Sequence, residues 1–305
     1  MSVKIDCSGA TDTGRVRKNN QDQFLIAELK KSMLVQACSL PLEQQSRLFG
    51  NAQGHLLLVA DGMGGHAAGE RASELAVDYM IQRLLNSVHW FFRLEDDVEK
   101  DFLLHLQNLL QEAHQRILDD GVVNVENRGM GTTLTMAYAI WPRLYVVHAG
   151  DTRCYLIRDG QAECMTRDHT LARQLVESGG MRPEEEAESR WSNVLWNVLG
   201  GHGDGDITVE VSKATLQVGD AIMLCSDGLY RYLDEPAIAD IVSRASSAAA
   251  ACDELIRLAN LRGGEDNITA VVGRYPRPLE ASDLDDDFVA APRDPSDEDT
   301  KPQGG

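Results

Sequence analysis

The sequence predicts an α+β fold in which antiparallel β-sheet lies between two layers of helices. Nine short apolar runs have the length and composition of strands, and several are joined by very short connections, which make antiparallel neighbours. One pair of helical segments follows the third strand, and a second pair lies near the C-terminus. Helices with no strand between them pack on one face of a sheet, so two such pairs predict two helical layers.

The predicted strands are, in chain order, 3–8, 23–28, 55–60, 132–140, 143–149, 153–158, 207–211, 221–225 and 268–275. Trp141-Pro142 joins the fourth strand to the fifth, and Asp159-Gly160 turns the chain after the sixth. The predicted helices are 67–86, 95–119, 235–245 and 247–261, because apolar residues recur there at helical spacing.

Two segments do not follow this scheme. Residues 30–54 have little periodicity and are interpreted as an excursion inserted before the third strand. Residues 168–205 combine a short helix, an acidic run and a glycine-rich stretch, so they form either a lid beside a site or ordinary connecting structure.

Composition limits the classes of function. The chain has 305 residues and a formal net charge of −19, which disfavours nucleic acid and anionic membranes as partners. Residues 276–305 hold five of the nine prolines and are strongly acidic, which is typical of a disordered tail outside a folded domain of residues 1–275. With no apolar run long enough to span a bilayer, no signal peptide and no paired cysteine spacing, we expect a cytoplasmic protein.

Four acidic residues lie where a predicted strand meets a loop. Asp61 and Asp227 each follow an apolar strand and precede glycine, Asp151 follows the fifth strand, and Asp266 precedes the last one. Carboxylates that converge at one sheet edge repel one another unless a cation neutralises them, and oxygen-only ligands suit Mg²⁺ or Mn²⁺. The pattern therefore indicates a divalent-metal hydrolase.

The glycine-rich run after Asp61 has an alternative interpretation. Gly62-Met63-Gly64-Gly65-His66-Ala67 fits the GxGxxA pattern of dinucleotide-binding loops. That interpretation would place the Asp61 carboxylate against a pyrophosphate without a cation, and the following helix leads to another helix instead of a parallel strand. Metal coordination is favoured because it uses the carboxylate.

An ordered set of motifs carries a family resemblance. It comprises Arg17…Asp22, Asp61-Gly62-Met63-Gly64-Gly65-His66, Gly131-Thr132-Thr133-Leu134, Gly150-Asp151-Thr152-Arg153, Ser226-Asp227-Gly228-Leu229 and Glu265-Asp266-Asn267-Ile268-Thr269. In this order the motifs resemble the PP2C-type (PPM) metal-dependent protein phosphatases, especially the bacterial members, over about residues 3–275. The resemblance implies an αββα sandwich of two antiparallel sheets flanked by helical layers, in agreement with the pattern.

The resemblance also implies roles for single residues. Asp61 and Asp227 would be the main ligands of a two-metal centre, completed by the Gly62 carbonyl and Asp266. Asp22 would act through metal-bound water and counts with Asp61 and Asp227 as catalytic.

Further implied roles concern substrate and a weaker metal. Arg17 would bind the substrate phosphate, and Asp151 would hold a third metal together with Asp227. Two positions depart from the pattern: Gln21 replaces a frequent Glu, and Met63 stands where animal members have a histidine thought to act as general acid.

The resemblance implies hydrolysis of phosphoserine and phosphothreonine in proteins, with two Mn²⁺ or Mg²⁺ ions and in bacterial relatives a third. The partner would be a phosphorylated protein, with a Ser/Thr kinase as counterpart, and we expect a monomer. Two alternatives stay open: a phosphatase fold that has lost turnover and acts as a binding protein, and a hydrolase of small phosphorylated metabolites.

Overall fold

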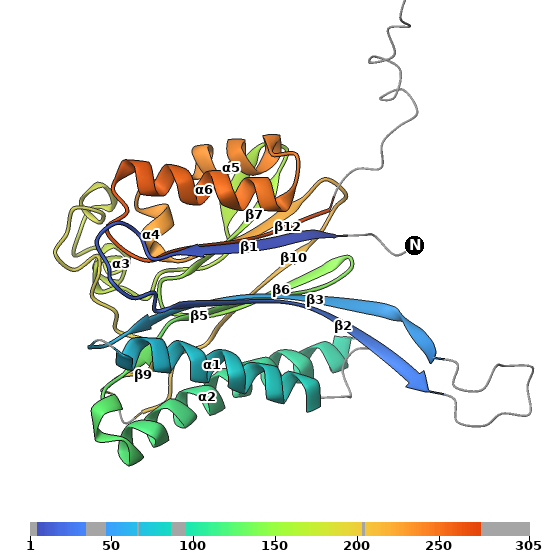
Figure 1. The fold of residues 1–305 in the computed structure, drawn as a ribbon, viewed down its shortest axis with the longest axis horizontal. Coiled ribbons are helices and arrows are strands. Elements are labelled where there is room, and N and C mark those ends of the chain that lie inside the picture. Colours follow the sequence, from blue (N-terminus) through green and yellow to red (C-terminus); the bar gives the residue numbers. More distant parts are fainter. Residues whose placement is uncertain (1–4, 35–46, 66, 87–95, 203–204, 276–305) are drawn as a thin grey trace, which may run out of the picture.

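Four layers make up the protein in a computed structural model that describes residues 5–34, 47–65, 67–86, 96–202 and 205–275. Two antiparallel sheets face each other, and each carries helices on its outer face (Figure 1). The predicted αββα sandwich is confirmed.

The first sheet has the strand order β1-β12-β11-β7-β8, and each neighbouring pair is antiparallel. Its strands are β1 (Asp6–Asp12), β7 (Arg153–Arg158), β8 (Gln161–Cys164), β11 (Ala221–Cys225) and β12 (Ile268–Arg274). β12 therefore lies between the first strand of the chain and β11, which brings both ends of the domain into one sheet.

The second sheet is built around β3, which pairs with β5 on one side and β2 on the other. β6 and β10 continue the sheet beyond β5, and the short β4 and β9 pair at the end of β3. The strands are β2 (Asp22–Leu34), β3 (Arg47–Met63), β4 (Gly131–Thr132), β5 (Leu134–Ile140), β6 (Arg143–Ala149), β9 (Leu199–Gly200) and β10 (Glu210–Thr215).

Two long helices cover the second sheet and two shorter ones cover the first (Figure 1). The long pair is α1 (Ala67–Asn86) and α2 (Asp96–Val123), and the other pair is α5 (Glu235–Arg244) and α6 (Ala248–Arg262). Short helices α3 (Leu171–Glu177) and α4 (Asp227–Tyr230) and the 3₁₀ turns η1 (Val125–Asn127) and η2 (Pro183–Glu185) lie in the connections. No helix among the described residues is long and apolar enough to cross a bilayer.

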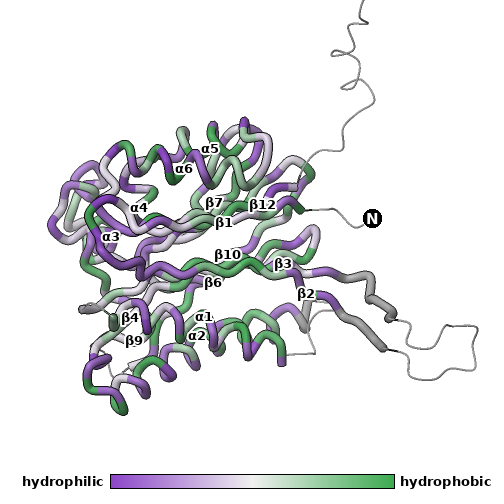
Figure 2. The backbone as a smooth tube through the Cα atoms, viewed as in Figure 1, coloured by the Kyte–Doolittle hydropathy of each residue, from purple (hydrophilic) through white to green (hydrophobic). Residues whose placement is uncertain are grey.

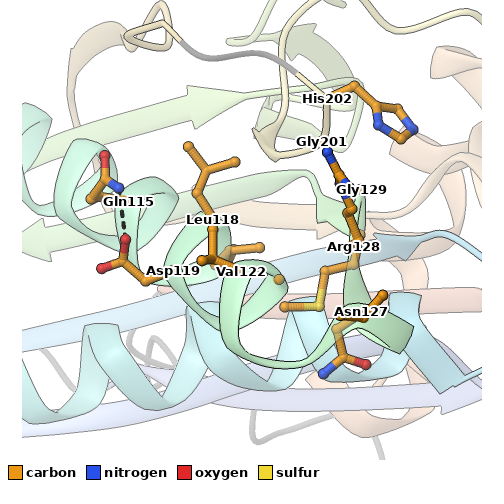
Figure 3. A pocket seen from close by; sticks show the side chains of 13 residues that line it. Gln115, Leu118, Asp119, Val122, Asn127, Arg128, Gly129, Gly201 and His202 are labelled. Carbon is orange, nitrogen blue, oxygen red and sulfur yellow. Dashed lines mark hydrogen bonds between the residues drawn. The ribbon is translucent and has the colours of Figure 1, made fainter.

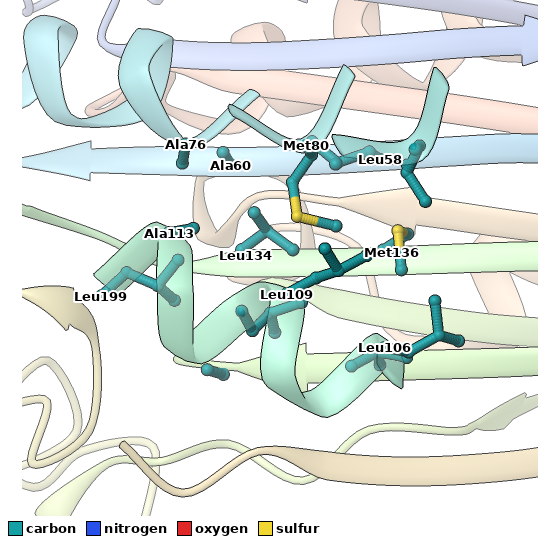
Figure 4. Close-up of a cluster of buried hydrophobic side chains, with 14 of the residues drawn as sticks. Leu58, Ala60, Ala76, Met80, Leu106, Leu109, Ala113, Leu134, Met136 and Leu199 are labelled. Atoms are coloured by element: carbon teal, nitrogen blue, oxygen red, sulfur yellow. The ribbon is translucent and has the colours of Figure 1, made fainter. Parts of the chain in front are cut away.

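The buried apolar side chains form three clusters, one for each contact between layers. One cluster joins α1 and α2 to the second sheet, and Figure 4 shows Met80, Leu109 and Met136 meeting there. Another joins α5 and α6 to the first sheet, and the third fills the space between the sheets. The apolar stretches of the strands accordingly run through the middle of the sandwich (Figure 2). With both faces covered, residues 56–60 of β3 and most of β5 and β6 are apolar and buried.

The structure corrects some predicted boundaries. The excursion predicted for 30–54 is wrong for its described part, because β2 and β3 extend through it as one hairpin from Asp22↔Asp61 to Leu34↔Arg47. The strand predicted at 207–211 begins at Glu210, since Gln111 and Gln107 of α2 bind the backbone of Ile207 and Val209. The first strand likewise begins later than predicted, and β8 was missed. The predicted tail 276–305 lies outside the described residues.

Candidate metal centre

Antiparallel pairing brings four of the predicted acids to one end of the sandwich. Asp22 and Asp61 are direct cross-strand partners where β2 begins. In the first sheet, β11 and β12 pair through Cys225↔Ala270, so the end of β11 and the start of β12 share an edge. Asp227 follows β11 and Asp266 precedes β12. The prediction that Asp227 and Asp266 lie at one edge is therefore geometrically consistent.

Asp22 connects the two sheets. Its Oδ2 accepts hydrogen bonds from Ser226 Oγ at 2.6 Å and from Thr269 Oγ1 at 2.7 Å. Ser226 immediately precedes Asp227, and Thr269 belongs to β12 of the first sheet. The other oxygen, Oδ1, is buried and has no hydrogen-bond partner, so its lone pairs are available to a cation or a proton.

The backbone around Asp61 fixes its position. Its N–H donates to Thr133 Oγ1 at 3.0 Å, and its carbonyl accepts from the Thr133 N–H at 2.9 Å. Gly62 N–H donates to the Gln21 carbonyl at 3.1 Å. A Cβ at Gly62 would clash with the carbonyl oxygen of Gly69, so only glycine lets the chain pass here.

Two arginines neutralise the other two acids. Asp227 opens α4 and forms an ion pair with Arg231 one turn later, while its Oδ1 is buried without a hydrogen-bond partner. Asp266 accepts a 2.6 Å hydrogen bond from Arg17 Nη2. The Asn267 side chain then holds the N-terminal loop, donating to the carbonyls of Thr13 and Asn19.

Asp151 lies in the connection from β6 to β7, where the chain crosses from one sheet to the other. It follows Gly150, whose φ of +117° is a conformation that side-chain-bearing residues rarely adopt. Only 4% of its surface is exposed. It is close enough to Asp227 and Arg231 for both charges to affect its ionisation.

Burial and mutual repulsion disfavour the charged forms of these carboxyls. Burial raises the pKa of Asp22 to about 7, with opposing hydrogen bonds from Ser226 and Thr269 and repulsion from Asp227. The pKa of Asp61 is raised well above its usual value by burial, then by Asp22 and Asp227. The pKa values of Asp151 and Asp227 are also raised, first by burial. A bound divalent cation would remove this cost.

The donor set fits Mn²⁺ or Mg²⁺, being made of carboxylates and a backbone carbonyl with two buried oxygens lacking partners. Within the described ranges, however, no three acidic, histidine or cysteine side chains are gathered closely enough to enclose an ion as they stand. Asp227 and Asp266 instead point to Arg231 and Arg17. A cation would therefore have to exchange with the guanidinium groups.

Cavity size alone does not mark this site. A cavity of about 580 Å³ lies at the end of α2, between Val122, Arg128 and His202 (Figure 3), and none of the clustered acids lines it. A cavity of about 460 Å³ is not lined by these acids either, but its wall includes Arg231, the ion-pair partner of Asp227. The carboxylate cluster, and not the volume, identifies the functional end of the sandwich.

Comparison with known proteins identifies the family. The sequence model described as Protein phosphatase 2C matches residues 40–262, most of the chain. The chain belongs to the protein phosphatase 2C family. A serine/threonine phosphatase of Listeria welshimeri is 30% identical over 262 residues, which cover 86% of this chain and 92% of the relative. The Mycobacterium tuberculosis phosphatase PstP is 34% identical over 273 residues, covering 89% of this chain and 45% of PstP.

Solved protein phosphatase 2C structures agree with the fold. A serine/threonine phosphatase of S. agalactiae superposes with a TM-score of 0.71 at 27% identity, covering 89% of this chain and 99% of that one. The catalytic domain of PstP in complex with two manganese ions superposes with a TM-score of 0.67 at 29% identity. The match covers 90% of this chain and 99% of the PstP domain. The chain is thus a metal-dependent protein serine/threonine phosphatase that uses Mn²⁺ or Mg²⁺, as its motifs indicated.

Several residues of the site were not singled out in the sequence. Ser226 and Thr269 hold Asp22, yet both belong to motifs that were used only for their aspartates. Arg231 was missed entirely, although an arginine four residues after Asp227 on a helix is within reach of it. His66, the last residue of the motif that begins at Asp61, lies outside the described residues.

Proposed function

We propose that the carboxylate cluster hydrolyses phosphoserine and phosphothreonine, with Asp61, Asp227, Asp266 and the Gly62 carbonyl holding the two ions. The observation that carries this assignment is the Asp22 bridge, because its bonds to Ser226 and Thr269 bring acids of both sheets to one place. Divalent ions bound there would supply Lewis acidity and a nucleophilic water at neutral pH. In the proposal Asp151 joins Asp227 in holding a third, weaker ion.

Arg17 is assigned to the substrate phosphate. Its side chain is 53% exposed and reaches the cluster from the N-terminal loop, with its guanidinium on Asp266. A guanidinium fork matches phosphate oxygens in two parallel hydrogen bonds. When the charge of Asp266 is neutralised by a cation, the same fork is released toward an incoming phosphomonoester.

Asp22 is assigned to holding a proton or a water molecule at Oδ1. That oxygen is buried without a partner, whereas Oδ2 is fixed by two hydroxyl groups. The carboxyl plane is therefore set by the protein and does not depend on the substrate. Such fixed geometry is what places a reacting water with little loss of entropy at the moment of reaction.

We assign residues 1–275 to the catalytic domain, with segment 168–205 beside the site, and the acidic residues 276–305 to a tail outside it. The substrate is a phosphorylated protein, and a Ser/Thr kinase would be the opposing enzyme. We propose the cytoplasm as its location and a monomer as its state.

Replacement of Asp227 by Asn tests the assignment. Loss of one charged ligand should lower Mn²⁺-dependent hydrolysis of p-nitrophenyl phosphate by about 100-fold or more, since metal catalysis contributes several kcal/mol. Mn²⁺ binding, measured by calorimetry without substrate, should weaken in parallel. Asp240→Asn is the matched control, because Asp240 also pairs with an arginine one turn away but lies exposed on α5.

Equal activity in wild type and Asp227→Asn would refute the metal-site assignment. Absence of activity in both, with intact Mn²⁺ binding, would support a binding protein that has lost turnover. A phosphothreonine peptide and a sugar phosphate at equal concentration separate the remaining alternatives. The proposal expects the peptide to be the better substrate.

A further inference from the structure

The cavity of about 460 Å³ beside the metal centre is lined by three arginines and two acids. Its wall includes Arg153, Asp168, Arg173, Glu186, Tyr230 and Arg231. Segment 168–205 supplies one side of it, and α4 supplies the other, at the end of the sandwich where Figure 1 shows α3 and α4. A pocket with more bases than acids is notable on a chain whose formal net charge is −19.

Two of the three arginines are neutralised inside the pocket wall. Arg153 makes two hydrogen bonds to Asp168, at 2.9 and 2.6 Å, and its guanidinium lies 3.6 Å from the centre of the Tyr230 ring. Arg173 Nε is 3.0 Å from Glu186 Oε1. Each of these two guanidinium groups therefore has a counter-charge within the pocket wall.

Arg231 differs, because its partner Asp227 belongs to the metal centre and not to the pocket. Its side chain is 34% exposed, so the guanidinium is accessible from the pocket. A divalent ion and Arg231 compete for the same carboxylate. Once an ion is bound, Arg231 loses this ion pair, whereas Arg153 and Arg173 keep theirs inside the pocket wall.

We propose that this pocket binds an acidic side chain, or a second phosphate, of the phosphoprotein next to the residue being dephosphorylated, and that Arg231 recognises it. The inference rests on the proposed function, since it takes the hydrolysed phosphate to lie at the metal centre. The pocket and the metal centre are close together, because Arg231 both pairs with Asp227 and lines the pocket. The substrate class is therefore a phosphoserine or phosphothreonine segment with a neighbouring acid.

The test compares phosphothreonine peptides that carry a single Glu, Ala or Lys at each position flanking the phosphorylated residue. At one or more positions, wild type should prefer Glu over Ala in kcat/KM by about fivefold to tenfold, the range expected for a partly exposed charge-assisted contact. Arg231→Gln should lose the preference, Arg231→Lys should retain part of it, and Arg231→Glu should favour Lys. Arg244→Gln is the matched control, being another arginine one turn after its aspartate but exposed on α5.

A second measurement does not depend on turnover. Arg231→Gln should bind Mn²⁺ more tightly than wild type in calorimetry without substrate, because a competing cation has been removed, while Arg244→Gln should not change. Equal hydrolysis of all peptides by wild type would overturn the pocket assignment and leave the proposed function standing. Failure to hydrolyse any peptide would overturn both, and unchanged or weaker Mn²⁺ binding in Arg231→Gln would overturn the competition.

Discussion

Asp22 illustrates how much of the site depends on single contacts between distant residues. Its carboxylate is 3% exposed and is held by Ser226 and Thr269, which are more than 200 positions away in the sequence. In the sequence Asp22 is an acid in a charged loop, and it entered the site only through the family resemblance. No local pattern could have revealed it, because its partners become neighbours only when β12 lies beside β1 and β2.

His148 is a buried titratable group of the interior next to the site. Its Nε2 lies 3.0 Å from the Arg167 carbonyl and its Nδ1 2.8 Å from Thr135 Oγ1. Burial lowers the pKa of His148 to about 3, with the nearby His169 ring lowering it further and Asp168 opposing. The folded protein therefore holds His148 neutral.

This histidine should make the protein sensitive to acid. The pKa of His148 is lower in the folded than in the unfolded protein. The stability that this difference contributes is fully present above pH 6.5, the usual pKa, and is lost as the pH falls toward 3. We expect the unfolding free energy of wild type to fall relative to His148→Gln by up to about 1.4 kcal/mol for each pH unit in that window. Urea titrations of both proteins, with a chelator present, measure this difference in unfolding free energy. The titrating carboxyl groups are the same in both proteins, so their effects cancel in the difference. Parallel pH profiles would contradict the assignment.

At the scale of elements, the contact between α4 and the start of β12 positions two of the predicted ligands. A Cβ at Gly228 would clash with the carbonyl oxygen of Asn267. The glycine thus lets the first turn of α4 lie directly against the chain that carries Asp266. In the sequence Gly228 is only the glycine that follows Asp227 after an apolar strand, but the reason for it is a contact with residue 267, 39 positions away.

Gly228→Ala should push these elements apart. We expect a loss of about 1–3 kcal/mol of unfolding free energy, as for other overpacked sites, together with weaker Mn²⁺ binding. Chemical denaturation and calorimetry measure the two effects. Gly205→Ala is the control, because no atom lies within 4 Å of its Cβ position. Equal behaviour of the two variants would show that the contact does not position the centre.

At the scale of the whole molecule, the centre lies where two sheets with separate cores come together. Asp22 and Asp61 belong to the second sheet, while Asp227 and Asp266 flank strands of the first. The cluster between the sheets is apolar and cannot compensate the charge at its end. A cation bound by acids of both sheets would therefore stabilise their association.

Mn²⁺ should accordingly stabilise the entire domain against unfolding. At a free concentration of one hundred times Kd, binding to the native state alone contributes about 2.7 kcal/mol. Thermal melts with Mn²⁺ and with a chelator measure the shift, which Asp227→Asn should largely lose and Asp240→Asn should retain. A shift of the same size in Asp227→Asn would place the stabilising ion elsewhere.

The sequence by itself determined the layers, most elements and the family. Helix α1 and strands β6, β7 and β11 have the predicted bounds, because their apolar periodicity follows directly from which faces are covered. The hairpin through residues 30–34 and 47–54 and the start of β10 were not predictable in this way, since pairing partners and contacts from α2 set them.

Only the tertiary structure decided which charges meet. The strand-end motifs marked Asp61, Asp151, Asp227 and Asp266, because a carboxylate after an apolar run is a local signal. The Asp22 bridge and the ion pair of Asp266 with Arg17 join residues that are far apart in the sequence. The ion pair of Asp227 with Arg231 is local but does not form a recognisable motif. Electrostatic interaction depends on distance in space, and in this fold that distance is set by the register of β11 with β12 and of β2 with β3.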